Sequence, residues 1–141
     1  MSTLIDGFTS HHRTLDAAFL AAHNAVDTAN WDRALGAFQT FWEAIERHMA
    51  TEERHLFPVY ERHHGADNPL TGILRKGHRD LRGFFEEISE TIGAHDADEA
   101  SALMGTVAQI LNHHDEKEEQ EFYPAVAPLI PNPEEITALL D

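Results

Sequence analysis

Cysteine is absent from this chain of 141 residues, and basic residues are few. Without thiols the chain can form no disulfide, thiolate nucleophile, zinc–thiolate site or iron–sulfur cluster of its own. Ten lysines and arginines face 25 aspartates and glutamates, which gives a formal net charge of -15. Such an acidic surface repels nucleic-acid phosphates, so we expect no nucleic-acid partner. Any metal chemistry has to use nitrogen and oxygen donors.

Long apolar runs are missing as well. No stretch approaches the ~20 apolar residues that a membrane span needs. Residues 1–7 hold no basic region that leads into an apolar one, as a secretory signal would. We therefore expect no membrane partner and a cytoplasmic location. The length and an apolar content of 42% predict one compact domain over residues 1–141.

A helical pattern of apolar residues occurs four times along the chain. Buried-type positions recur at steps of three and four over residues 5–26, 34–59, 71–92 and 100–125, which is typical of helices with one buried face. Short polar turns join these segments, so neighbouring helices should be antiparallel. The sequence predicts an all-α fold, an up-down-up-down four-helix bundle.

Local signals refine this prediction. Asn30 and Asn68 suit the N-cap positions of the second and third helices. Pro58 and Pro124 fall late in the second and fourth helices, where we expect them to bend or end the helix. Residues 132–135 (Asn-Pro-Glu-Glu) predict a short C-terminal helix that packs on the bundle.

The second half of the chain repeats the first at an offset of 66 residues, without a gap. The matched residues include His12 with His78, His48 with His114, and Glu52 with Glu118. A helix hairpin used twice packs about a pseudo-twofold axis, so the repeated polar residues should converge on that axis. The repeat therefore predicts a central site.

Histidine is abundant, with 11 residues, and five of them interrupt the apolar stripes. In the two HxxxE pairs, His48 with Glu52 and His114 with Glu118, the members lie one turn apart on the same helix face. A single histidine on an apolar face is more often a hydrogen-bonded core residue than a ligand. Six buried histidines and glutamates without a metal would be severely unfavourable, so together they favour a metal site.

The number of donors predicts two ions. With His12 and His78 added, each half of the bundle offers two imidazoles and one carboxylate. A glutamate on each side of the axis can bridge two ions, and mixed nitrogen and oxygen ligation suits iron or manganese. We expect a carboxylate-bridged centre of two non-haem iron ions.

These residues resemble those of the hemerythrin-like (HHE cation-binding) family. The resemblance covers about residues 4–129 and includes the segments HMATEERHLFP (48–58) and HDEKEEQEFYP (114–124). It implies that His12, His48, His78 and His114 are terminal iron ligands, and that Glu52 and Glu118 bridge the irons.

The chain differs from the oxygen-carrying hemerythrins, which have a second histidine one turn from the first on the third helix. Here those positions are Leu74 and Arg82. The symmetric set of four histidines and two glutamates is similar to hemerythrin-like proteins linked to iron–sulfur repair, to nitric oxide or peroxide chemistry, and to iron or oxygen sensing. The resemblance thus implies a small ligand: dioxygen, peroxide or nitric oxide. Reaction with that ligand, storage of oxygen or iron, and a metal-dependent sensor module that acts on an unknown protein partner all stay open, as does enzymatic turnover.

Several polar residues around this set are harder to assign. His55 lies in the predicted stripe three residues after Glu52, and its repeat partner is Glu121. His55 could be a fifth imidazole ligand, the two residues could form a pair that orients or gates the site, or both could be partly exposed. His11 and His113 point about 100° away from their ligand neighbours and should face solvent. Tyr123 could donate a hydrogen bond to a bound oxygen species, although packing is its favoured role.

Overall fold

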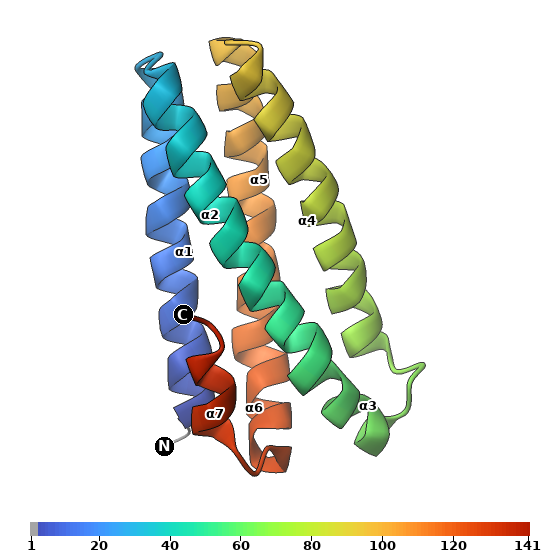
Figure 1. Ribbon diagram of the computed structural model, residues 1–141. Coiled ribbons are helices and arrows are strands. Elements are labelled where there is room, and N and C mark those ends of the chain that lie inside the picture. Colours follow the sequence, from blue (N-terminus) through green and yellow to red (C-terminus); the bar gives the residue numbers. More distant parts are fainter. Residues whose placement is uncertain (1–2) are drawn as a thin grey trace.

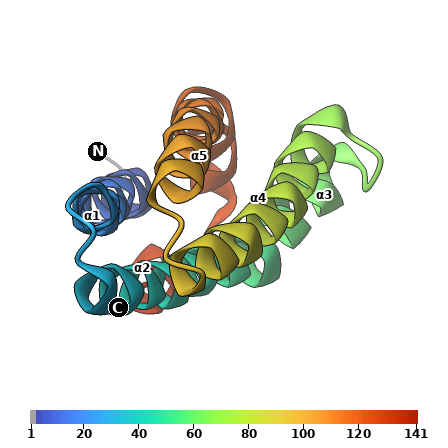
Figure 2. The ribbon, with the colours of Figure 1, turned by 90° about the horizontal axis from the view of Figure 1, so that it is seen from above.

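The computed structural model describes residues 3–141, which form helices joined by short turns and include no strand. The first two residues of the predicted domain lie outside the described residues. The body consists of four long helices, α1 (Thr3–Asp27), α2 (Trp31–Thr51), α4 (Pro69–Gly93) and α5 (Ala97–Lys117). Figure 1 shows α1 and α2 side by side and running in opposite directions, and α4 and α5 as a second such pair. Figure 2, in which the bundle is seen from above, shows that α1 also lies beside α5 and that α2 lies beside α4. The predicted all-helical bundle is confirmed.

Side-chain caps begin α2, α4 and α5. The side chains of Asn30, Asn68 and Asp96 each accept a hydrogen bond from the backbone N–H three residues later, at 3.4, 2.9 and 3.1 Å. Each cap satisfies a donor that the first helical turn leaves without an intrahelical partner. The two predicted N-caps, Asn30 and Asn68, are confirmed.

Two wide helical turns follow α2 and α5. They are the π-helical segments η1 (Glu52–Leu56) and η2 (Glu118–Phe122). The backbone N–H groups of Phe57 and Tyr123 donate to the carbonyl of the first residue of each turn, five residues earlier. A π turn holds one more residue than an α turn, so every side chain after it is rotated around the helix axis.

The chain stays helical beyond both prolines. It continues as α3 (Phe57–His64) and α6 (Tyr123–Val126), with Pro58 and Pro124 in the first turn of each segment. Proline is tolerated there because its missing N–H has no intrahelical partner to lose. The prolines therefore follow a change in helical register rather than end the helices.

The apolar core has two parts, with a polar layer between them. The larger part surrounds Leu15, Phe41 and Leu81, and the smaller part surrounds Phe8 and Leu74. On α1 and α4 the residues between these two parts are His12 and His78, which are 1% and 0% exposed. The polar layer is thus closed to water by apolar side chains at both ends.

The end of the chain covers the lower part of α1 through η3 (Ala127–Leu129) and α7 (Pro133–Ala138). A Cβ atom at Gly7 would lie 2.7 Å from Thr137 Cγ2, so glycine permits this close approach. The predicted C-terminal helix, and its packing on the bundle, are confirmed. None of the helices within residues 3–141 is long and apolar enough to cross a membrane.

Candidate metal centre

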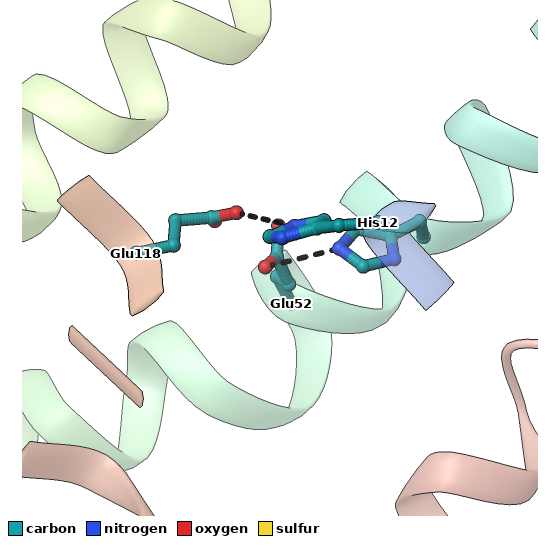
Figure 3. Close-up of side chains that lie close together, drawn as sticks. His12, Glu52 and Glu118 are labelled. Atoms are coloured by element: carbon teal, nitrogen blue, oxygen red, sulfur yellow. Dashed lines mark hydrogen bonds and ion pairs between the residues drawn. The ribbon is translucent and has the colours of Figure 1, made fainter. Parts of the chain in front are cut away.

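The six histidines and glutamates predicted as ligands meet in the polar layer. His12, His48, His78 and His114 come from α1, α2, α4 and α5, while Glu52 and Glu118 begin the two π turns. All are buried except His114, whose side chain is 11% exposed. Figure 3 shows His12, Glu52 and Glu118 pointing toward one another from three separate elements. The repeat thus brings its polar residues together, as the sequence predicted.

The donor atoms form two groups that share both glutamates. The first group consists of His12, His48, Glu52 and Glu118, and the second of His78, His114 and the same two glutamates. Within each group, one donor atom from every residue lies within 4.8 Å of the others. Each group contains two imidazoles and two carboxylates, a set of nitrogen and oxygen donors that suits a divalent first-row metal ion.

Each glutamate directs one oxygen toward each group. Glu52 Oε2 lies 3.3 Å from His48 Nε2, and its Oε1 lies 3.2 Å from His78 Nε2. Glu118 Oε1 lies 3.1 Å from His12 Nε2, and its Oε2 lies 3.5 Å from His114 Nε2. Both carboxylates therefore have the orientation that a bridge between two ions requires.

Four of these buried donor atoms make no hydrogen bond within the described chain. They are Glu52 Oε1, His78 Nε2, His114 Nε2 and Glu118 Oε2, and all belong to the second group. The atoms are close together, but their directions do not satisfy hydrogen-bond geometry. Burying a polar atom without a partner costs about 1–3 kcal/mol. The donor set therefore fits a cation, which would satisfy all four atoms at once.

Carboxylates hold the outer nitrogens of two of the rings. His12 Nδ1 lies 2.7 Å from Glu119 Oε2, and His78 Nδ1 lies 2.7 Å from Glu53 Oε2. An Nδ1–H that donates to a carboxylate fixes the tautomer that leaves Nε2 free to bind metal. Arg13 binds Glu119 and Arg82 binds Glu53, which orients both carboxylates.

The other two rings have different surroundings behind them. His11 stacks on His48 at 5.0 Å between ring centroids, and their Nδ1 atoms lie 2.8 Å apart. The prediction that His11 faces solvent is therefore wrong. The repeat partner of His11 is Gly77, where a Cβ would lie 2.7 Å from His114 Nδ1. Glycine at 77 lets the His114 ring pack directly against the α4 backbone.

The carboxylate charges of the site favour the protonated, positively charged form of its histidines. Burial lowers the pKa of His12, but the hydrogen bond and charge of Glu118 outweigh it and raise the pKa to about 10. Burial likewise lowers the pKa of His78, and the Glu52 and Glu53 carboxylates raise it to about 9. The positive histidines beside Glu118 hold its pKa well below the usual range despite burial. Metal ions would have to displace these imidazole protons.

A fifth carboxyl side chain, that of Asp115, lies at the edge of the first donor group. Its Oδ1 lies 3.4 Å from His12 Nε2, and burial raises its pKa to about 7. It lines a small cavity of about 10 Å³ on the side of the larger core, together with ligand candidates and apolar residues such as Phe41 and Leu111. A space of that size holds about one water molecule.

Two predicted members of the stripe lie outside the site. His55 is exposed and belongs to neither donor group, and its repeat partner Glu121 is exposed as well. The π turns explain these positions, because their extra residue rotates both side chains outward and turns Phe57 and Tyr123 inward. His55 lies beside Arg54 and Leu139 at the surface.

Glu53, Glu119 and His11 were not predicted as site residues. The repeat carried a signal for the two glutamates, because Glu53 and Glu119 match each other directly after the HxxxE glutamates. His11 left no such signal, because its repeat partner is a glycine. Its role depends on how closely α1 and α2 approach.

A helical bundle with two buried groups of histidine and glutamate has the architecture of a metal-binding protein. A family model, the hemerythrin HHE cation binding domain, matches residues 3–126. The chain therefore belongs to the hemerythrin HHE family, as its motifs predicted. Comparisons with curated proteins and with solved structures found no match.

Proposed function

We propose that this up-down-up-down bundle of two helix hairpins holds two iron ions and reacts with, or senses, dioxygen, peroxide or nitric oxide. His12 and His48 would bind one ion, and His78 and His114 the other. Glu52 and Glu118 would bridge them. The observation that carries the proposal is the set of four buried donor atoms without hydrogen bonds, which face one another across the second group.

The donor chemistry supports a transition metal such as iron over magnesium or calcium. Four imidazoles are too many for magnesium or calcium, which take oxygen ligands, whereas mixed nitrogen and oxygen ligation suits iron or manganese. The chain also has no thiolate, the soft ligand that selects zinc or copper(I). Bound iron would supply redox chemistry and coordination positions that the protein leaves open. The residues of the chain would hold the ions, fix the ring orientations and limit access.

The surroundings of the site favour a very small ligand. The small cavity holds about one water-sized molecule, and Phe41, Ile45 and Leu111 line it beside the donor atoms. A diatomic molecule or a peroxide is of that size, whereas an organic substrate would require the core to open. This supports dioxygen, peroxide or nitric oxide as the ligand class.

Metal content and the visible spectrum test the proposal. Protein purified without oxygen should contain close to two irons per chain, and exposure to air should produce a charge-transfer band. His78→Ala should lose at least one iron, whereas His113→Ala, at an exposed position next to His114, should keep both. No bound metal, or zinc with no spectral response, would refute the proposal.

The same spectrum separates reaction from storage or sensing. A band that decays while added peroxide or nitric oxide is consumed would indicate turnover. A band that forms and reverses without consumption of the ligand would indicate oxygen storage or a metal-dependent sensor. Release of iron without any ligand response would indicate an iron store.

A further inference from the structure

The hydroxyl of Tyr123 lies among the donor atoms of the first group. The side chain is 0% exposed. Tyr123 Oη donates to Glu52 Oε2 at 2.6 Å and lies 3.1 Å from Glu118 Oε1. It also lies 3.1 Å from His12 Nε2 and 3.3 Å from His48 Nε2. One oxygen thus contacts a donor atom from every residue of this group.

These distances are those of neighbouring donors around one ion. Ligands about 2.1 Å from a metal and at right angles to each other are about 3.0 Å apart. Within the first group, His12 Nε2 and Glu118 Oε1 already lie 3.1 Å apart, and His48 Nε2 and Glu52 Oε2 lie 3.3 Å apart. The Tyr123 oxygen lies 2.6–3.3 Å from all four atoms, a range that includes this spacing. It therefore stands where a fifth donor to the same ion would stand.

The internal repeat shows that the tyrosine hydroxyl belongs to one half of the site. The partner of Tyr123 at the offset of 66 is Phe57, which stacks on His78 with ring centroids 5.3 Å apart. Phenylalanine has the same ring but no oxygen. The four buried donor atoms without hydrogen bonds all belong to this second group. The hydroxyl is thus an addition to a shared framework rather than a packing requirement.

Packing holds the phenol ring in this position. The π turn η2 turns Tyr123 inward, and its ring contacts those of Phe8, Phe122 and His12 at 5.4, 6.0 and 5.6 Å between centroids. A donor that is already oriented loses little side-chain entropy when it binds.

We propose that Tyr123 is a fifth protein ligand of the ion at the first group, which it binds through its phenolate oxygen. This inference rests on the proposed function, because it requires an ion at that group. When the ion binds, the O–H bond breaks, the proton leaves to solvent and the oxygen bonds to the metal, so no oxidant or reductant is needed. The two ion positions are then inequivalent, with five protein donors at the first and four at the second.

The visible and resonance Raman spectra of the ferric protein test this assignment. A phenolate bound to iron(III) gives a broad charge-transfer band, and excitation in that band enhances the ring vibrations of the bound tyrosine. The chain contains only two tyrosines. Tyr123→Phe should lose the band and the ring vibrations while it keeps two irons. The matched control Tyr60→Phe should keep both features.

Ring-deuterated tyrosine gives a second measurement that does not depend on folding of the Tyr123 variant. In labelled Tyr60→Phe protein, Tyr123 is the single tyrosine, and the enhanced vibrations should shift to lower frequency. Enhanced vibrations that do not shift would overturn the assignment. Ferric protein that contains two irons and shows no enhanced tyrosine vibrations would also overturn it, because the hydroxyl would then only donate a hydrogen bond to Glu52. Protein without iron would instead refute the proposed function.

Discussion

The carboxylate behind His12 should control how tightly the site binds metal. Glu119 Oε2 lies 2.7 Å from His12 Nδ1, and Arg13 binds the other oxygen at 2.9 Å. Glu119→Gln keeps the length of the side chain and removes the charge that supports the donating Nδ1–H. Loss of such a partner usually weakens metal binding 10–100-fold, which is about 1.4–2.8 kcal/mol. Because the Glu119 side chain is 20% exposed, solvent screens its charge, and we expect about a tenfold loss.

Titration with Mn²⁺ or Fe²⁺ under nitrogen, in competition with a chelator, measures this loss. Glu53→Gln should act alike through His78, and the double variant should lose about tenfold at each ion position, since the two carboxylates lie behind rings that would bind different ions. Glu116→Gln is the matched control, because Glu116 is exposed at the end of α5, just before η2, and contacts Asn112. The reasoning is refuted if Glu119→Gln and Glu116→Gln bind metal with equal affinity.

Three further predictions concern stability and the second donor group. Removal of metal with a chelator should lower the Tm clearly, and an apo form as stable as the holo form would contradict the site. In the metal-free protein the pKa values of about 10 for His12 and about 9 for His78 exceed the usual 6.5. The protonated rings therefore stabilise the folded metal-free protein fully below pH 6.5 and progressively less at higher pH. Thermal melts should show its Tm falling as the pH rises toward 9–10. Gly77→Ala should displace the His114 ring and reduce metal content, whereas Gly83→Ala on the same helix, with no atom within 4 Å of the new Cβ, should retain both ions.

The ligand candidates were predictable because they obey regular helical spacing. His12 and His78 lie within the α-helices α1 and α4, His48 and His114 precede a π turn, and Glu52 and Glu118 begin one. The period of 3.6 residues therefore places all six correctly on the inner face. The repeat at an offset of 66 residues also predicted that the polar residues of the two halves meet. The structure places both HxxxE pairs in one layer. The hydrogen bonds of Glu53 and Glu119 to the histidine rings were not predicted, because they join side chains on different helices.

The sequence by itself determined the helical class, the caps at Asn30 and Asn68, and the candidate donor set, because these follow from local capping and from the period of a straight helix. The tertiary structure decided what lies around that set. The π turns at Glu52 and Glu118 insert one residue each, which the apolar pattern does not reveal, and they turn His55 outward and Tyr123 inward. The turned-in side chains place the Tyr123 hydroxyl in one donor group and the ring of Phe57, which has no hydroxyl, beside His78 of the other.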